Sequence, residues 1–285
     1  MTSAVFRSAV RNRLIAHNPC DDIRVPKRRR TDEDDQIIAR SVFRNRLLPV
    51  LPRRHRGIVA IAGGAGLRWG EAAGMCADAL DLDRAQVHVR RTVIEVAGTT
   101  SFKPFPKSTA GRRTVPLPAW LVTILREHME RYPLGAGDLV FANAVGGALR
   151  RTLFRSRVRR PALVRAGQLG TVIEIEQGTC WEASWTDTLG NRHRQTFDNE
   201  RQAVQHVARS QAGGGLRFHD LRHSYATWLV DDGVPPNMVQ RVMGHERAAT
   251  TLDLYTRRTN DPTRILQALN DEDPDDGPAA AMVPA

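Results

Sequence analysis

The spacing of apolar side chains predicts a protein built mainly of amphipathic helices. Apolar residues recur three and four positions apart, and glycine or proline bounds most of these stretches, as expected for helices with one face against a core. After Leu216, for example, Leu221, Tyr225 and Trp228 share one helical face. Helices are predicted at residues 4–17, 31–46, 58–65, 120–131, 150–165, 216–232, 235–243 and 248–258, with a further one from residue 70.

Short runs of β-branched and aromatic residues predict a smaller β component. Residues 81–96 and 113–117 are strand-like, and residues 138–141 form a short extended piece. Residues 103–112 are rich in turn-forming residues and connect the first two of these segments. We therefore expect a mixed, mainly α fold with a small antiparallel β-sheet.

Residues 168–212 differ in character from the rest of the chain. Three strand-like runs, at 171–176, 180–186 and 192–197, are separated by glycine-containing turns. A helical stretch at 199–212 follows, and three consecutive glycines lead back into the helical pattern. The pattern predicts a compact β-β-β-α module inserted into a larger domain.

The charge of the chain indicates a polyanionic partner. Forty-two Lys and Arg against 31 Asp and Glu leave a net charge of +11, with a pI near 10.7. The body is more basic than this total, because residues 271–276 at the start of a tail predicted to be disordered are mostly acidic. On composition alone, a genome that favours Arg codons would explain the same excess.

Cysteine usage and hydropathy indicate a cytoplasmic protein. Cys20, Cys76 and Cys180 are far apart and show no Cys-x-x-Cys spacing, which argues against a disulfide scaffold or a zinc ribbon. The first residues contain no long apolar run behind their basic positions, and no stretch approaches the ~20 apolar residues of a membrane helix. We expect neither a signal peptide nor a membrane partner.

The run His219-Asp-Leu-Arg222-His223 is the first candidate for chemistry. On a helix, His219 and Arg222 lie on one face, and an imidazole beside a guanidinium suits the binding of phosphate. A solvated helix face is the ordinary alternative. His219 and His223 also have the spacing of a zinc helix, but the Arg between them and the lack of a third ligand at a familiar spacing argue against a metal.

Three further segments are unremarkable when each is taken alone. Gly66-Leu-Arg68-Trp-Gly-Glu71 places an arginine at a helix start. Lys107 lies on a turn before the strand at 113–117, and Gly244-His245 is followed ten residues later by Tyr255 on the last predicted helix. An isolated turn lysine is usually solvated, and an isolated tyrosine on an apolar helix is usually structural.

In this order, the four segments resemble the tyrosine recombinase (phage integrase) family over about residues 31–259. The family's first arginine box, G-L-R-x-x-E, is similar to Gly66–Glu71, and its second box, H-x-L-R-H, is similar to His219–His223. Its third box resembles Met243-Gly-His-Glu-Arg-Ala-Ala-Thr-Thr-Leu-Asp-Leu-Tyr255, and its lysine turn resembles Pro106–Leu117. Four matches in the right order and spacing are specific where any single match is weak.

The resemblance implies a site-specific DNA recombinase or integrase of a mobile element that works through a 3′-phosphotyrosine intermediate, without metal, ATP or another cofactor. Tyr255 would be the nucleophile, while Arg68 and Arg222 would bind the non-bridging oxygens and stabilise the charge of the transition state. The remaining roles would be those of His219 as base, Lys107 (or Lys103) as proton donor to the 5′-oxygen, His245 as phosphate or tyrosine ligand, and Glu71 and His223 as supporting residues.

The implied partner is double-stranded DNA, bound by a homotetramer with accessory DNA-bending proteins in the nucleoid. Two alternatives stay open: a catalytically incomplete DNA-binding remnant of an integrase, and a type IB topoisomerase, which the wording of the third box disfavours. The module at 168–212 resembles the small three-stranded arm-binding modules of some integrases. A surface insertion without DNA contact is an equal alternative.

The expected domains follow from these matches. Residues 1–30 would be a remnant helix and basic linker of a missing N-terminal DNA-clamp domain. Residues 31–167 and 213–262 would form a tyrosine recombinase catalytic domain, interrupted by the module at 168–212. Residues 263–285 would be an acidic disordered tail.

Overall fold

The computed structural model describes residues 2–23, 36–103 and 112–244, which belong to two units, Met1–Asp35 and Gln36–Ala285. In the first unit, α1 (Thr2–Arg11) is shorter than the predicted helix at 4–17. Arg13 adopts a positive φ of 57°, which a continuing α-helix does not allow. Asn18 then binds back to the Ser3 hydroxyl at 3.2 Å, so the chain after α1 folds into turns.

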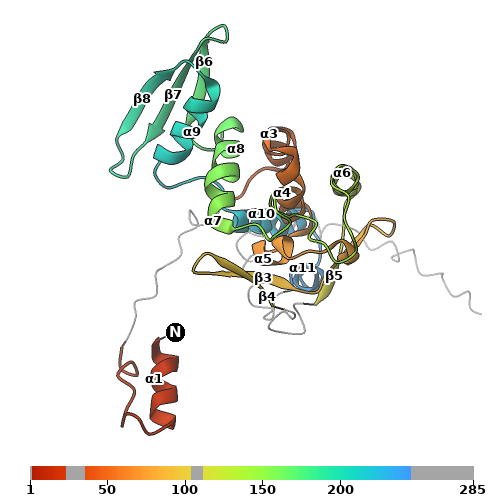
Figure 1. The fold of residues 1–285 in the computed structure, drawn as a ribbon, viewed down its shortest axis with the longest axis vertical. Coiled ribbons are helices and arrows are strands. Elements are labelled where there is room, and N and C mark those ends of the chain that lie inside the picture. Colours follow the sequence, from red (N-terminus) through yellow and green to blue (C-terminus); the bar gives the residue numbers. More distant parts are fainter. Residues whose placement is uncertain (1, 24–35, 104–111, 245–285) are drawn as a thin grey trace, which may run out of the picture. The chain divides into compact units, whose positions relative to one another are not determined.

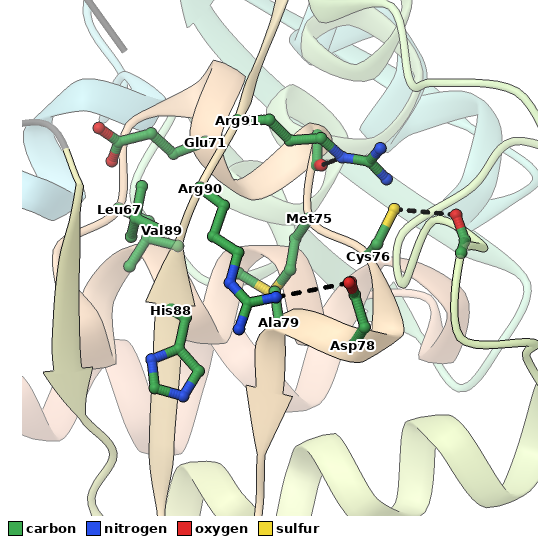
Figure 2. A pocket seen from close by; sticks show the side chains of 12 residues that line it. Leu67, Glu71, Met75, Cys76, Asp78, Ala79, His88, Val89, Arg90 and Arg91 are labelled. Atoms are coloured by element: carbon green, nitrogen blue, oxygen red, sulfur yellow. Dashed lines mark hydrogen bonds and ion pairs between the residues drawn. The ribbon is translucent and has the colours of Figure 1, made fainter. Parts of the chain in front are cut away.

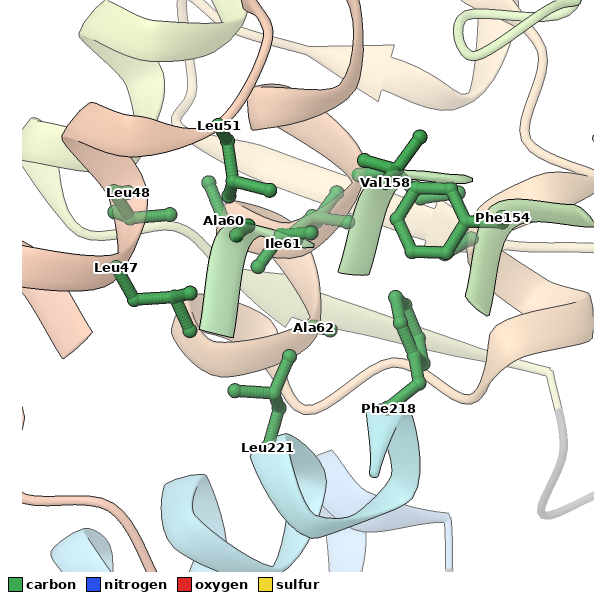
Figure 3. Close-up of a cluster of buried hydrophobic side chains, with 14 of the residues drawn as sticks. Leu47, Leu48, Leu51, Ala60, Ile61, Ala62, Phe154, Val158, Phe218 and Leu221 are labelled. Carbon is green, nitrogen blue, oxygen red and sulfur yellow. The ribbon is translucent and has the colours of Figure 1, made fainter. Parts of the chain in front are cut away.

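The core of the second unit forms around α4 (Arg53–Ala65), which begins five residues before its predicted start and is buried from Gly57 onward. It packs against α6 (Ala119–Arg131) and α10 (Phe218–Asp231) (Figure 1). Side chains of α4 and α10 meet the aliphatic residues Leu47, Leu48 and Leu51 in this core (Figure 3). Because most of α4 is buried on all sides, its apolar residues are not confined to one face. The spacing of apolar residues therefore predicted only residues 58–65 of this helix.

Two glycines allow the close packing of α4. A Cβ atom on Gly63 would lie 2.4 Å from the Phe43 ring, and one on Gly64 would lie 2.8 Å from the Trp120 ring. Both distances are far below van der Waals contact, so the aromatic rings lie directly on the helix backbone. This packing fixes the position of α4, which leads directly into the first arginine box at Gly66.

The predicted strand at 81–96 is wrong as a single element. It is divided into β1 (Leu80–Asp81), β2 (Gln86–Val89) and β3 (Thr92–Val96), because Ala85 takes a positive φ of 51° in a turn. β2 pairs antiparallel with β1 and with β5 (Arg113–Pro116). β3 forms a separate hairpin with β4 (Thr99–Lys103), a strand that the sequence pattern did not predict.

The remaining elements of the larger domain are short. A helical stretch before α4 comprises α2, a π-helical segment (η2) and α3, and the predicted basic helix at 150–165 comprises α7, η5 and α8. Their bounds, with those of the other short helices, are α2 Arg40–Val42, η2 Phe43–Leu47, α3 Leu48–Val50, α5 Trp69–Ala73, η3 Ala77–Ala79, α7 Arg151–Phe154, η5 Arg155–Arg159, α8 Arg160–Arg165 and α11 Pro236–Met243.

The segment after α8 has the strands that the turn residues predicted. β6 (Thr171–Glu176), β7 (Cys180–Thr186) and β8 (Arg192–Phe197) form an antiparallel sheet in that order. α9 (Glu200–Ser210) packs against β7. Arg160 of α8 ties α9 to the larger domain, since its Nε donates to Ala208 O at 2.5 Å and its Nη2 donates to Gln211 O at 2.6 Å.

The fold is therefore mixed and mainly α, as predicted, although its strands form three small antiparallel sheets within the described residues. None of the helices in the described part of the chain has the length and apolar character needed to cross a lipid bilayer.

Candidate active site

The first arginine box turns sharply at Gly66. This residue ends α4 in the left-handed conformation, with φ of 64°, and a Cβ atom there would lie 2.5 Å from the Tyr225 ring. The turn makes Arg68 the N-cap of α5, where the Glu71 carboxylate accepts from the Arg68 backbone nitrogen at 2.9 Å. The Arg68 guanidinium also binds Glu71, Nη1 to Oε1 at 2.9 Å, and its side chain is 40% exposed.

Glu71 is buried together with a second arginine, Arg113, at the start of β5. The two side chains are only 7% and 4% exposed, and they form an ion pair with two hydrogen bonds, of 2.9 and 3.1 Å. Burial raises the pKa of Glu71, but the bonds to Arg113 and the charges of Arg68 and Arg222 reverse this and lower it to about 2. Glu71 is therefore ionised at neutral pH.

Arg222 lies beneath this group on α10. Arg222 is only 2% exposed. Its guanidinium donates to the carbonyl oxygen of Gly66 at 2.5 Å and to that of Met243. Burial lowers its pKa to about 9, and the charge of Arg68 acts in the same direction. The alternative of a solvated helix face is wrong for this residue, because α10 is covered by the ends of α4 and α11.

Arg68 and Arg222 meet at the C-terminal end of α11. Arg68 Nη2 donates to Gly244 O at 3.3 Å, next to the Met243 carbonyl that Arg222 binds. Gly244 adopts φ of 59° and ends the helix. Guanidinium groups from two distant segments thus converge on the two residues that precede His245.

His219 lies one turn before Arg222 on α10. Its ring centroid is 4.6 Å from that of His223, with the two rings perpendicular. Burial lowers the pKa of His219 to about 4, and the charges of His223, Arg222 and Arg68 contribute. The imidazole is therefore neutral at pH 7 and has a lone pair that can accept a proton.

The structure brings Arg68, Arg222, His219, His223 and Glu71 together. Lys107, His245 and Tyr255 lie outside the described residues, and Lys103, the rival of Lys107, is exposed at the end of β4. Tyr225 is buried in α10, and burial raises its pKa to about 12. A phenol with that pKa is a poor nucleophile, which leaves the choice of Tyr255 unchanged.

Arg113 is the site residue that the sequence reasoning missed. The alternation of β5 contained a signal for it, because Arg113 shares a strand face with Val115 and Leu117, which are both buried. An arginine on the inward face of a strand needs a buried partner. Neighbouring Arg112 is exposed.

A cavity of about 120 Å³ adjoins the site and is lined by Glu71, Cys76, His88 and Arg91, among others (Figure 2). Local hydrogen bonds join residues of its lining, such as Cys76 Sγ to Gly137 O at 3.0 Å and Arg91 Nε to Gly74 O at 2.9 Å. This volume is large enough for only a few water molecules. In the part of the chain that the structure describes, no cluster of three metal-ligating side chains occurs.

The chain is also similar to known proteins. A model of the phage integrase family matches residues 181–261. The tyrosine recombinase XerC-like protein of Caldanaerobacter subterraneus subsp. tengcongensis is 26% identical over 281 residues, covering 93% of this chain and 63% of the relative. Prophage integrase IntR of Escherichia coli is 24% identical over 258 residues, covering 88% and 54%. The chain thus spans 54–63% of the length of these two relatives.

Solved structures show the same fold. The Tn1549 transposon integrase in complex with circular intermediate DNA superposes with a TM-score of 0.61 at 16% identity, covering 94% of this chain and 76% of that one. The XerA recombinase superposes with a TM-score of 0.50 at 16% identity, covering 88% and 68%. The described fold is that of a tyrosine recombinase catalytic domain. The chain is thus similar in sequence and in fold to the tyrosine recombinase (phage integrase) family, whose model matches residues 181–261.

Proposed function

We propose that this chain is a DNA strand transferase of a mobile element, which breaks and rejoins DNA at specific sites through a 3′-phosphotyrosine on Tyr255. The observation that carries the proposal is the convergence of Arg68 and Arg222 on the neighbouring carbonyls of Gly244 and Met243. The segment that contains His245 and Tyr255 begins at this point. A cationic site that immediately precedes the segment containing Tyr255 in the chain supports the proposal.

The two arginines address the main obstacle of the reaction, which is the negative charge of a phosphodiester. Their planar guanidinium groups stay protonated and match the geometry of phosphate oxygens. In the proposed reaction they bind the two non-bridging oxygens and stabilise the charge that grows in the transition state. Arg68, the more exposed, would contact the diester first.

The proton transfers fall to the remaining residues. The usual pKa of a tyrosine is about 10, so Tyr255 needs a base and a cationic environment. His219 would take its proton, since the ring is neutral at pH 7. Lys107 would give a proton to the leaving 5′-oxygen, and His245 would donate to the phosphate. Glu71 and His223 would support these groups, and the reaction balances without a metal, ATP or other cofactor.

Double-stranded DNA is the proposed partner, bound by a homotetramer in the cytoplasm, in association with the nucleoid and accessory DNA-bending proteins. The charge of +11 supports an anionic partner. Residues 150–165 contribute seven arginines and no acidic residue to this positive charge. Arg151, Arg155 and Arg157 in this stretch are exposed, and they would bind backbone phosphates.

We also propose the domain division given by the motifs, with 31–167 and 213–262 as the catalytic domain and 168–212 as an insertion. The segment 168–212 contains six acidic and four basic residues, a net charge of −2 in a strongly basic chain. That balance favours a surface insertion over a DNA-binding module.

The decisive experiment captures the covalent intermediate. The protein would be incubated with a library of nicked duplexes of randomised sequence, and complexes that survive SDS would be recovered and sequenced. We expect adducts with the full chain and none with Tyr255→Phe, which should keep its salt-sensitive DNA binding. EDTA should change neither result.

The alternatives predict different outcomes. Binding without any adduct would favour the catalytically incomplete remnant. Relaxation of supercoiled plasmid without site preference would favour a type IB topoisomerase. An adduct that persists in Tyr255→Phe would show that another residue is the nucleophile.

A further inference from the structure

Arg113 lies at the centre of the site without reaching its surface. Its Nη1 and Nη2 bind the two oxygens of Glu71, and its Nε donates to Val242 O at 2.7 Å, in the last turn of α11. Its side chain is almost fully buried. Because its guanidinium donates to Glu71 and to Val242 O, we expect Arg113 to influence the chemistry through the groups that it holds.

Glu71 is shared between Arg113 and Arg68. Its Oε1 accepts from the Nη1 atoms of both arginines, and its Oε2 accepts from Arg113 Nη2 and from the backbone nitrogen of Arg68. One negative charge therefore faces two guanidinium groups. Arg113 makes the two side-chain bonds in the more buried position, where an ion pair is screened least.

We propose that Arg113 is a positioning residue that neutralises Glu71 and thereby leaves the charge of Arg68 available for a phosphate. Without Arg113, Arg68 would be the guanidinium that binds the carboxylate directly, and the carboxylate would compete with the phosphate for it. The bond to Val242 O also holds the turn of α11 that ends at Gly244, whose carbonyl accepts from Arg68. The inference rests on the proposed function, in which Arg68 binds the scissile phosphate.

The competition can be tested by removing the cation and then the carboxylate. In Arg113→Met, the single-turnover rate of adduct formation on a saturating nicked duplex should fall about 100-fold, the usual effect of losing one contact to a developing oxyanion. The double variant Arg113→Met/Glu71→Gln should recover at least about ten-fold of that loss, because the competing charge is gone. Duplex affinity should change little in both.

A matched control removes another buried arginine. Arg160 also donates to two backbone carbonyls but lies at the α8–α9 contact. Arg160→Met should leave the adduct rate unchanged, and thermal unfolding of each variant would report its stability. If Arg113→Met does not fold, Arg113→Lys, which keeps the charge and loses the paired geometry, takes its place with and without Glu71→Gln.

A neutral substrate separates positioning from a purely structural role. A methylphosphonate at the scissile position carries no charge and needs less cationic stabilisation. The defect of Arg113→Met should shrink to about ten-fold on this substrate, in parallel with that of Arg68→Ala. Equal defects on both substrates, with no recovery in the double variant, would overturn the proposal.

Failure of the proposed function would have a different signature. If the wild-type chain forms no adduct with any duplex, strand transfer is refuted, while the role of Arg113 stays testable with inorganic phosphate. Phosphorus NMR should then show weaker phosphate binding in Arg113→Met and recovery in the double variant. Equal phosphate binding in all three proteins would refute the role of Arg113.

Discussion

Replacing Glu71 by glutamine removes the buried carboxylate that faces Arg68 and Arg113. The resulting loss in the free energy of unfolding follows from the pKa of that carboxylate. Burial raises that pKa, and the bonds to Arg113 with the charges of Arg68 and Arg222 lower it from the usual 4.5 to about 2. At about 1.36 kcal/mol per pKa unit, the ionised carboxylate contributes about 3 kcal/mol to the free energy of unfolding. The glutamine side chain is isosteric with that of glutamate, but its amide group would face guanidinium donors that need an acceptor.

The pH dependence has a definite sign. A carboxylate whose pKa is lowered by folding stabilises the protein above its unfolded pKa, and this contribution is lost as the pH falls toward the folded pKa. The free energy of unfolding of the wild type should therefore exceed that of Glu71→Gln by about 3 kcal/mol at pH 7. The difference should narrow below pH 4.5 and approach zero near pH 2.

Urea unfolding of the full chain at a series of pH values measures this difference directly. Glu130→Gln, on the exposed surface of α6, is the matched control and should have no effect at any pH. A difference below about 1 kcal/mol at pH 7, which is no more than an exposed pair contributes, would refute the reasoning. A difference that stays constant down to pH 3 would refute it as well.

Three further outcomes are expected. Gly70→Ala should destabilise the fold by about 2–3 kcal/mol, because its Cβ would lie 2.5 Å from Val93 O, whereas Gly137→Ala, with nothing within 4 Å, should be silent in the same urea assay. The ring of His219 should stay neutral in an NMR titration until the pH approaches 4; a midpoint near 6.5 would contradict its burial. Arg160→Met should leave the carbonyls of Ala208 and Gln211 without their donor, at a cost of about 1–3 kcal/mol. Limited proteolysis should then cut residues 166–215 faster than the rest, and a uniform change would argue against this local link.

The bounds of elements that are set by turn and capping residues could be predicted from the sequence. β6, β7 and β8 have the predicted bounds, since Gly178 and Gly190 take the positive φ values that their turns require. Asn199 caps α9 with its side chain. In contrast, the exposed strand β4 has no apolar alternation, and only its pairing with β3 defines it.

The sequence by itself determined which residues are candidates for the chemistry, because the order and spacing of the boxes around Arg68, Arg222 and Tyr255 are specific. It did not single out Arg113, although the burial of Val115 and Leu117 on the same strand face marks that face as the inward one. Only the tertiary structure decided that Arg113 pairs with Glu71, 42 positions away, and that Arg222 binds Gly66 O, 156 positions away. Periodicity reports which face of an element is buried, whereas the partner on the other side depends on packing between segments that are distant in the chain.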